Sequence, residues 1–203
     1  MGVSLKGPSI RDIILKKIPN FGKKLVLQVG YYEGASYPDG TSVGAVATIQ
    51  EYGAVIQHPG GTKYIKDAVT SRMVNDPDTG KKKKVYTVGL RFVANNFVGE
   101  TLVTGPHTIV IPARPFFRTA LEKNAAKWRS DFAKIFKNTG FDVEKSMAAL
   151  GSIIKQDIQQ QIDNTYSPPN AASTIRAKKG ETHPLIGLNK QLRNSIAWQV
   201  TQI

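Results

Sequence analysis

Two consecutive amphipathic stripes constrain the fold of this chain more than any other feature. Apolar residues recur at helical spacing over 117–135 and again over 143–162, which predicts two long helices. Pro115 favours the start of the first helix, and Asp142 can cap the second. Basic residues flank the first stripe and acidic residues flank the second. We therefore expect the two helices to pack antiparallel, with complementary charge.

The segment between residues 54 and 112 has the composition of β-structure. β-branched and aromatic residues are enriched over 84–93 and 107–111, as is typical of strands. A stretch dense in turn residues, 75–80, comes directly before Lys81–Lys84. These features predict a protruding β-hairpin with the four lysines near its tip.

The patterns together predict an α+β protein, in which an antiparallel sheet with a protruding β-hairpin packs against two long helices, with extended terminal arms. A strand is predicted at 25–29, and a helix from Thr41 or Ser42 to Gly53. We expect residues 1–24 to form an N-terminal helical arm. We expect residues 25–203 to form a single α+β domain, with a β insertion at about 62–105.

The composition excludes several classes of protein. The chain has no cysteine, which rules out a disulfide scaffold, thiol catalysis and a cysteine zinc site. Its longest apolar runs fall far short of the roughly 20 residues that span a bilayer, and the N-terminus predicts neither a signal peptide nor myristoylation. We therefore expect a soluble, intracellular-type protein without membrane contact.

The chain carries 28 Lys and Arg residues against 15 Asp and Glu residues, a formal net charge of +13. Such a surplus favours contact with nucleic acid, because basic side chains release counterions from phosphates. Lys81–Lys84 is the sharpest basic cluster, and it has two interpretations: a solvated loop tip, or a contact with an acidic protein or with DNA. No aromatic residue interrupts this run, so stacking on single strands is not supported.

The sequence does not match the familiar catalytic patterns. His58, His107 and His183 lie far apart and in no metal-ligand spacing. The 76–80 segment lacks the remaining ligands of a calcium loop, and Gly60–Lys63 lacks the order of a phosphate-binding loop. An unrecognised hydrolase would need a cleft with a strongly shifted carboxylate or histidine. We expect no enzymatic activity, no cofactor and no metal site.

A strand-to-helix corner at Ile111–Arg118 contains two prolines, two arginines and two adjacent aromatic residues. Neighbouring side chains on a helix do not point to the same core, so we expect Phe116 and Phe117 to have different surroundings. Either the corner only buries one Phe, or the other Phe and an Arg also serve a subunit interface.

Two further segments suggest contacts with neighbours. The polar, proline-started stretch 167–180 is either a long surface loop or a segment that orders against another subunit. The hairpin contains Tyr86, Phe92 and Phe97, more aromatic residues than an isolated two-stranded ribbon can bury. The candidate residues for a subunit or partner interface are Arg114, Phe116, Phe117, Arg118, Lys81, Lys82, Lys83, Lys84, Pro168, Pro169, Arg176, Lys178 and Lys179.

Four stretches, in order and over most of residues 25–200, carry a resemblance to a known family. They are Val29–Ala35 with Tyr37–Ser42, Ala47–Gly53, Ile111–Arg118, and the tail from Ser167 through Pro184-Leu185-Ile186 to Ile196. With these motifs the chain resembles the tail-completion, or head–tail joining, proteins of long-tailed bacteriophages, including the Mu-like virion-morphogenesis group. Residues 62–105 make a larger β insertion than in short members of that family.

The resemblance implies a non-enzymatic virion protein that forms a ring, often a hexamer, at the neck or the head-proximal end of the tail. Such a ring terminates the tail tube and joins it to the head connector. The implied partners are other copies of the chain, the tail tube and sheath proteins, the connector or adaptor, and genomic DNA that passes through the lumen without sequence-specific contact. The implied location is the virion, after assembly in the host cytoplasm. The alternative is a sequence-independent DNA-binding protein that uses the basic surface and Lys81–Lys84.

Overall fold

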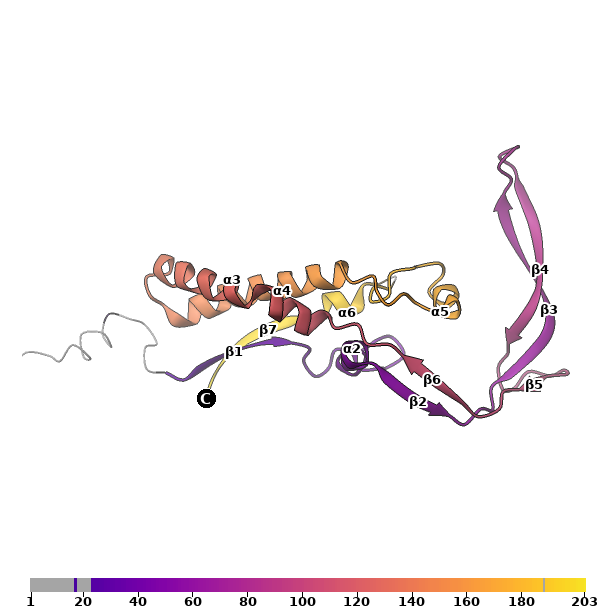
Figure 1. The fold of residues 1–203 in the computed structure, drawn as a ribbon, viewed down its shortest axis with the longest axis horizontal. Helices are drawn as coiled ribbons and strands as arrows, with labels where there is room; N and C mark the ends of the chain where they lie inside the picture. Colours follow the sequence, from indigo (N-terminus) through magenta and orange to yellow (C-terminus); the bar gives the residue numbers. More distant parts are fainter. Residues whose placement is uncertain (1–16, 18–22, 188) are drawn as a thin grey trace, which may run out of the picture. The chain divides into compact units, whose positions relative to one another are not determined.

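A computed structural model describes residue 17, residues 23–187 and residues 189–203 (Figure 1). Almost all of the expected N-terminal helical arm therefore lies outside the described residues. In chain order the elements are β1 (Leu25–Gly30), α2 (Val43–Tyr52), β2 (Ala54–His58), β3 (Lys63–Asn75), β4 (Lys82–Phe92), β5 (Leu102–Val103), β6 (His107–Ile111), α3 (Phe116–Asn138), α4 (Val143–Asp163), α5 (Ala172–Ala177), α6 (Gln191–Asn194) and β7 (Ala197–Gln202).

Helices and antiparallel sheets occur together, so the predicted α+β class is confirmed. The chain divides into two compact units. The first, which we call the helical unit, consists of the described residues of Met1–Ala54 and Ile111–Ile203. The second, the β-unit, is Val55–Val110 and contains the predicted insertion. No helix in the described part of the chain is long and apolar enough to cross a membrane.

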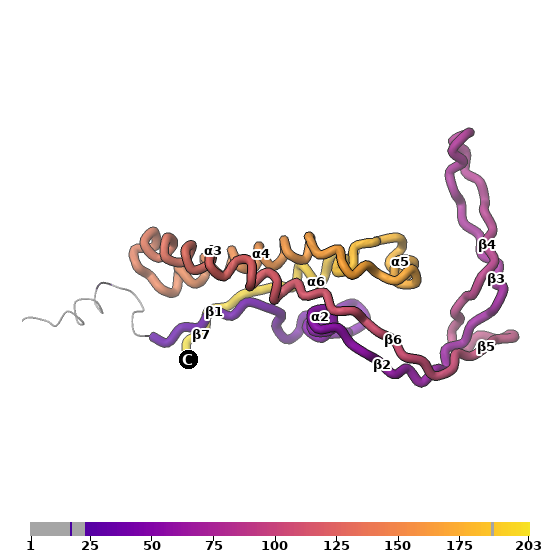
Figure 2. Tube along the Cα trace, in the orientation of Figure 1, coloured from indigo at the N-terminus to yellow at the C-terminus, as the bar shows by residue number. Residues whose placement is uncertain are grey.

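Helices α3 and α4 lie side by side in the helical unit (Figure 2). Both begin close to where the sequence predicts, and the Asp142 side chain caps α4 by accepting the Lys145 N–H at 3.1 Å. Asp157 of α4 joins the two helices, because its Oδ2 accepts the Trp128 indole N–H at 2.7 Å and lies 2.9 Å from the Lys127 ammonium. One pair of opposite charges, Lys127 and Asp157, therefore meets between these helices.

The first and last strands of the helical unit pair with each other. β1 and β7 are antiparallel, from Leu25 opposite Gln202 to Gly30 opposite Ala197, and the ribbon packs on α4. Gly151 permits this close approach, since a Cβ there would lie 2.8 Å from the Trp198 ring and 3.0 Å from a Leu27 methyl. The buried core of the unit is formed by Val43, Ala47, Phe116, Ala120, Ile158, Ile162, Leu185, Leu192 and Ile196.

The β-unit consists of two small sheets. β3 and β4 form a long antiparallel hairpin, with β5 beside the first residues of β3, and β2 pairs with β6. The hairpin contains a bulge between Ile65 and Ala68, where Asp67 has a φ of 59°. Residues 55–110 are all described, and not one of them is buried.

The turn of this hairpin is built from the predicted turn residues. The Asp76 carboxylate accepts the N–H groups of Asp78 and Thr79 at 3.0 and 3.2 Å, and Gly80 adopts a φ of 67°. Three of the four lysines, Lys82–Lys84, are not in the turn but form the first residues of β4. The four lysines therefore lie near the tip of the hairpin, with Lys81 next to the turn and the other three at the start of the strand.

Candidate interface sites

The corner between α2 and α3 is held by a buried carboxylate. Val43, Ala47 and Glu51 recur every four residues and so face the core together, and Glu51 is only 5% exposed. Its Oε2 accepts the Phe117 N–H at 2.8 Å, and its Oε1 accepts the Arg118 N–H at 3.0 Å. The N-cap residue Pro115 offers no side-chain cap, so Glu51 supplies from another helix the cap that α3 lacks.

Arg114 belongs to the interior of the subunit. It is 4% exposed, and its Nε donates to the Pro168 carbonyl at 2.7 Å, its Nη2 to the Pro169 carbonyl at 3.0 Å and its Nη1 to the Gln50 side chain at 2.8 Å. Burial lowers the pKa of this guanidinium below its ordinary value. Arg114 therefore ties the corner to the start of the 167–180 segment. The buried Arg114 side chain is therefore not available to a partner, whereas Pro168 is half-buried and Pro169 exposed, so both remain candidates.

The two adjacent aromatic residues have more similar surroundings than the sequence predicts. Phe116 is fully buried, and Phe117 is half-buried against the same core cluster. Their rings meet edge to face, with centroids 6.2 Å apart. The expectation that they cannot share one core is corrected, because Phe117 covers the edge of the cluster that Phe116 fills. Phe116 is not accessible to a partner.

The surface beside this corner offers an accessible aromatic and arginine pair. Tyr52 is 65% exposed, and the Arg118 guanidinium carbon lies 4.8 Å from the centroid of its ring. A hollow of about 290 Å³ adjoins the pair and is also lined by Tyr31, Thr48 and Phe117. We call Tyr52, Phe117 and Arg118 the junction patch. Tyr, Phe and Arg are the residue types that subunit interfaces favour.

The basic residues of the 167–180 segment fall into two groups. The Lys178 ammonium donates to the His183 carbonyl, and burial lowers the pKa of this lysine while nearby Glu181 opposes the shift. Arg176 and Lys179 are exposed. Lys178 therefore lies against its own chain, beside a second hollow of about 440 Å³, and only Arg176 and Lys179 remain accessible candidates.

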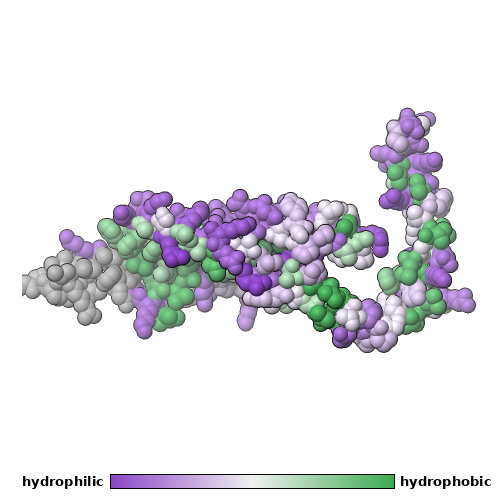
Figure 3. All heavy atoms as spheres, in the orientation of Figure 1, coloured by the Kyte–Doolittle hydropathy of each residue, from purple (hydrophilic) through white to green (hydrophobic). Residues whose placement is uncertain are grey.

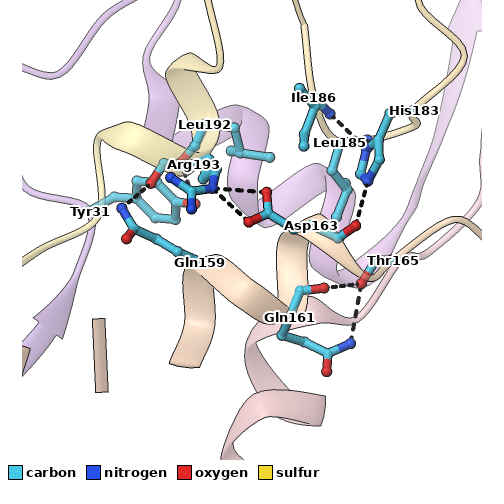
Figure 4. A network of polar contacts seen from close by, with 10 residues as sticks. All are labelled: Tyr31, Gln159, Gln161, Asp163, Thr165, His183, Leu185, Ile186, Leu192 and Arg193. Atoms are coloured by element: carbon cyan, nitrogen blue, oxygen red, sulfur yellow. Dashed lines mark hydrogen bonds and ion pairs between the residues drawn. The ribbon is translucent and has the colours of Figure 1, made fainter. Parts of the chain in front are cut away.

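His183 organises the tail of the chain (Figure 4). Its Nδ1 accepts the N–H groups of Leu185 and Ile186 at 3.2 and 3.1 Å, and its Nε2 lies 3.1 Å from the Asp163 carbonyl. Since Nδ1 accepts twice, the proton sits on Nε2 and is donated to that carbonyl. His183 is thus a structural residue that joins the tail to the end of α4.

A second set of contacts fixes α6. Arg193 Nε lies 2.8 and 2.9 Å from the two Asp163 oxygens, and Gln159 donates to the Arg193 carbonyl at 3.0 Å (Figure 4). The Tyr31 hydroxyl donates to the Leu192 carbonyl at 2.9 Å, and burial raises the pKa of this tyrosine. Each polar group faces another group of the same unit. In the described residues, every buried side-chain nitrogen or oxygen has a hydrogen-bond partner, and no cluster of three metal-ligating side chains occurs.

The exposed large apolar side chains of the β3–β4 hairpin are concentrated on one of its two faces. Opposed residues in the register share a face, and residues two apart along a strand share it too. Ser71 and Asn75, opposite Tyr86 and Lys82, lie on one of the two faces. The same face, which we call the apolar face, carries Tyr64, Val69, Met73, Tyr86, Val88, Leu90 and Phe92. Except for the half-buried Tyr64, these side chains are between 57% and 66% exposed. Hydrophobic residues are visible on the hairpin surface in Figure 3.

The opposite face is polar at the same level of the hairpin. Thr70 and Thr87 stand opposite each other there, with their hydroxyl oxygens 2.9 Å apart. Near the tip, Lys82 and Lys84 are on the apolar face and Lys83 on the polar one. Lys81–Lys84 are exposed and make no ion pair with any carboxylate in the described residues.

Several residues with the best-defined geometry were not among the sequence candidates. The signal for Glu51 is a carboxylate that continues the four-residue spacing of Val43 and Ala47. His183 and Asp163 have no comparable local signal, since their partners, which are backbone groups and the Arg193 side chain, are brought together by the fold. Searches of protein-family models, curated proteins and solved structures found no match for this chain.

Proposed function

We propose that this chain is a structural virion protein that forms a ring at the neck or head-proximal end of a bacteriophage tail, terminates the tail tube and joins it to the head connector. Its partners in this proposal are its own copies, a hexamer by family resemblance, with the tail tube, the sheath, and the connector or adaptor. Genomic DNA passes through the lumen without sequence-specific contact. The observation that carries the proposal is the β-unit without a single buried residue.

A β-unit of this kind requires contacts outside itself. A two-stranded ribbon is marginally stable in water, and a sheet with an apolar face needs more strands or a covering layer. The exposed apolar side chains of β3 and β4 gain that cover only from another surface. Such a unit is expected in a protein that works in an assembly, and it supports the resemblance carried by the sequence motifs.

The junction patch supplies the second argument. In a ring of identical subunits, one surface of each subunit contacts a different surface of its neighbour. The ring closes when repetition of this contact returns to the first subunit. Tyr52 and Arg118 are exposed beside a hollow of the helical unit, and Glu51 fixes Arg118 in place. We assign this patch to the contact between ring neighbours.

The polar network favours a structural over a catalytic role. The groups that a catalytic site would use, His183 and Asp163, bind backbone atoms and Arg193 of their own unit. Their hydrogen bonds hold α4, the tail and α6 together, which accounts for their positions without a substrate.

Electron microscopy of the purified chain tests the proposal. We expect class averages of a closed ring whose central opening is wide enough for duplex DNA. Tyr52→Ser should dissociate the ring, whereas Tyr166→Ser, at a tyrosine of equal exposure far along the chain, should leave it closed. Single subunits in every class average of the wild-type chain would contradict the proposal.

A second candidate function rests on the lysine run. Four exposed lysines without carboxylate partners can contact phosphates, so a sequence-independent DNA-binding protein remains the alternative. It predicts a duplex affinity that falls steeply with salt and depends on Lys81–Lys84.

A further inference from the structure

We propose that the apolar face of the β3–β4 hairpin packs against the same face of a second copy of this chain, in antiparallel orientation. This contact goes beyond the proposed ring. It uses the β-unit, whereas the ring contact uses the junction patch of the helical unit, and each can fail without the other.

The exposed apolar side chains of the hairpin gather on this one face, which favours its burial against another surface. Val69 and Val88 stand opposite each other at its middle and are 64% and 66% exposed. Scattered exposed apolar residues are normal on a protein surface, but a continuous strip along one face marks an interaction site. The threonine pair at the same level of the opposite face needs no such cover.

The order of side chains along this face is self-complementary. The aromatic pair Tyr64 and Phe92 lies at the base, the valine pair lies in the middle, and Tyr86 and Met73 lie toward the tip. A two-fold axis through the valine pair places the valines of the two copies together. It also sets Met73 of one copy over the aromatic base of the other, a contact that thioethers and aromatic rings favour.

The lysines at the tip select the antiparallel orientation. Lys82 is six residues from Val88, or about 20 Å along the strand. With antiparallel packing the two tips are separated by about 40 Å, several times the screening length of about 8 Å at physiological salt. Parallel packing would instead bring both tips within the roughly 10 Å that separates stacked sheets. In the antiparallel pair Lys84 also reaches the partner's aromatic base, as it already lies 5.4 Å from the ring of its own Tyr86.

A second copy is the occupant that this surface fits best. Every folded chain presents the same uncovered strip, so an identical strip is available in equal amount wherever the protein is made. The faces match apolar to apolar, and two ribbons of the same twist can stack with their strands within about 30° of each other. Such an isologous contact uses the same surface on both copies, so it joins two subunits and leaves no free surface for a third.

Cross-linking of single-cysteine variants tests this contact, because the natural chain contains no cysteine. A bismaleimide that spans about 10 Å matches the distance between stacked sheets. With Val88→Cys, at the proposed axis, we expect efficient conversion to a covalent dimer. With Thr87→Cys, the neighbouring residue on the opposite face, we expect little dimer under the same conditions.

A third variant fixes the orientation. Met73→Cys should cross-link to itself poorly, because its counterpart lies near the far end of the partner hairpin. Self-linking of Met73→Cys as efficient as that of Val88→Cys would overturn the antiparallel contact. Equal cross-linking of Val88→Cys and Thr87→Cys, or none with either, would overturn the pairing altogether and show that another protein or another part of the chain covers the face.

The ring and the hairpin contact are separated by one more pair of variants. In a chain that carries Val69→Cys, opposite residue 88 at the proposed axis, Val88→Lys should abolish cross-linking while class averages of closed rings persist, and Thr87→Lys should change neither. Loss of rings with retained hairpin pairing would refute the proposed function and leave the hairpin contact standing.

Discussion

Arg118 and Glu51 are joined by three hydrogen bonds. The Arg118 backbone N–H and its Nε both donate to Glu51 Oε1 at 3.0 Å, and its Nη2 donates to the Glu51 carbonyl at 3.0 Å. One residue of the junction patch is thus positioned by the same carboxylate that caps α3. The end of α2, the start of α3 and the exposed arginine form one rigid corner, and substitutions at this corner separate folding from assembly.

Replacement of the carboxylate should weaken the fold. We expect Glu51→Ala to lower the free energy of unfolding by about 2–3 kcal/mol, because the N–H groups of Phe117 and Arg118 lose their cap in a buried place. Arg118→Ala should cost less than about 1 kcal/mol, since this side chain is half exposed and its ion pair is screened by water. Urea unfolding of both variants measures the difference, and equal losses would contradict the capping role.

The two aromatic residues of the corner should respond differently to truncation. Phe116→Ala should cost about 3–5 kcal/mol of subunit stability, because it opens a cavity in the core. Phe117→Ala should cost distinctly less and should impair ring assembly, since Phe117 lines the hollow of the junction patch. Unfolding curves and particle images of the same preparations test this. If both variants merely unfold the subunit, Phe117 does not belong to the interface.

The cap of α4 should make stability depend on pH in the acid range. The Lys145 N–H, which donates to Asp142, lowers the pKa of this carboxyl below its ordinary value of 3.8, and the Lys145 charge adds to the shift. Because the pKa of Asp142 is lower in the folded state, its ionised carboxylate stabilises the fold at pH values above the ordinary pKa. This stabilisation is lost as the pH falls through the pKa of the folded state.

Asp142→Asn isolates this contribution, because asparagine caps a helix but does not titrate. We expect the wild type to be the more stable protein at neutral pH, and the difference to shrink between about pH 5 and pH 2. Thermal unfolding over this range measures it. A difference that does not vary with pH would show that the Asp142 charge contributes nothing.

Replacement of Lys81–Lys84 by serine distinguishes the ring from the DNA-binding alternative. We expect the variant to form the same closed rings and to show little change in its weak attraction for duplex DNA. If DNA binding is the function, the plot of log affinity against log salt should become less steep, with a slope that is less negative by about 4. Filter binding over a salt series, with images of the same samples, tests both outcomes.

Local signals in the sequence were sufficient for most of the elements. The apolar spacing of α3 and α4, the cap at Asp142 and the turn residues before Lys81 act over a few positions, and the structure places helices and a turn there. The pairing of β1 with β7 could not be predicted in this way, because it joins the two ends of the described chain. Hydrophobic alternation identifies a strand but not its partner.

The candidate site could be predicted only in part for the same reason. Charge and aromatic content drew attention to the corner, but they did not distinguish buried Arg114 from exposed Arg118, four residues later. That distinction depends on Gln50, Pro168 and Pro169, which accept from Arg114 across more than fifty residues. The apolar face of the hairpin likewise emerges only once the register of β3 and β4 is known.

Native mass spectrometry of the full chain over a broad concentration series tests the central claim most directly. The account predicts one closed stoichiometry that persists on dilution, or twice that mass where hairpins of two rings pair, and Val88→Lys should leave only the single ring. A chain that stays a single subunit at every concentration, or a continuous ladder of masses without closure, would contradict it.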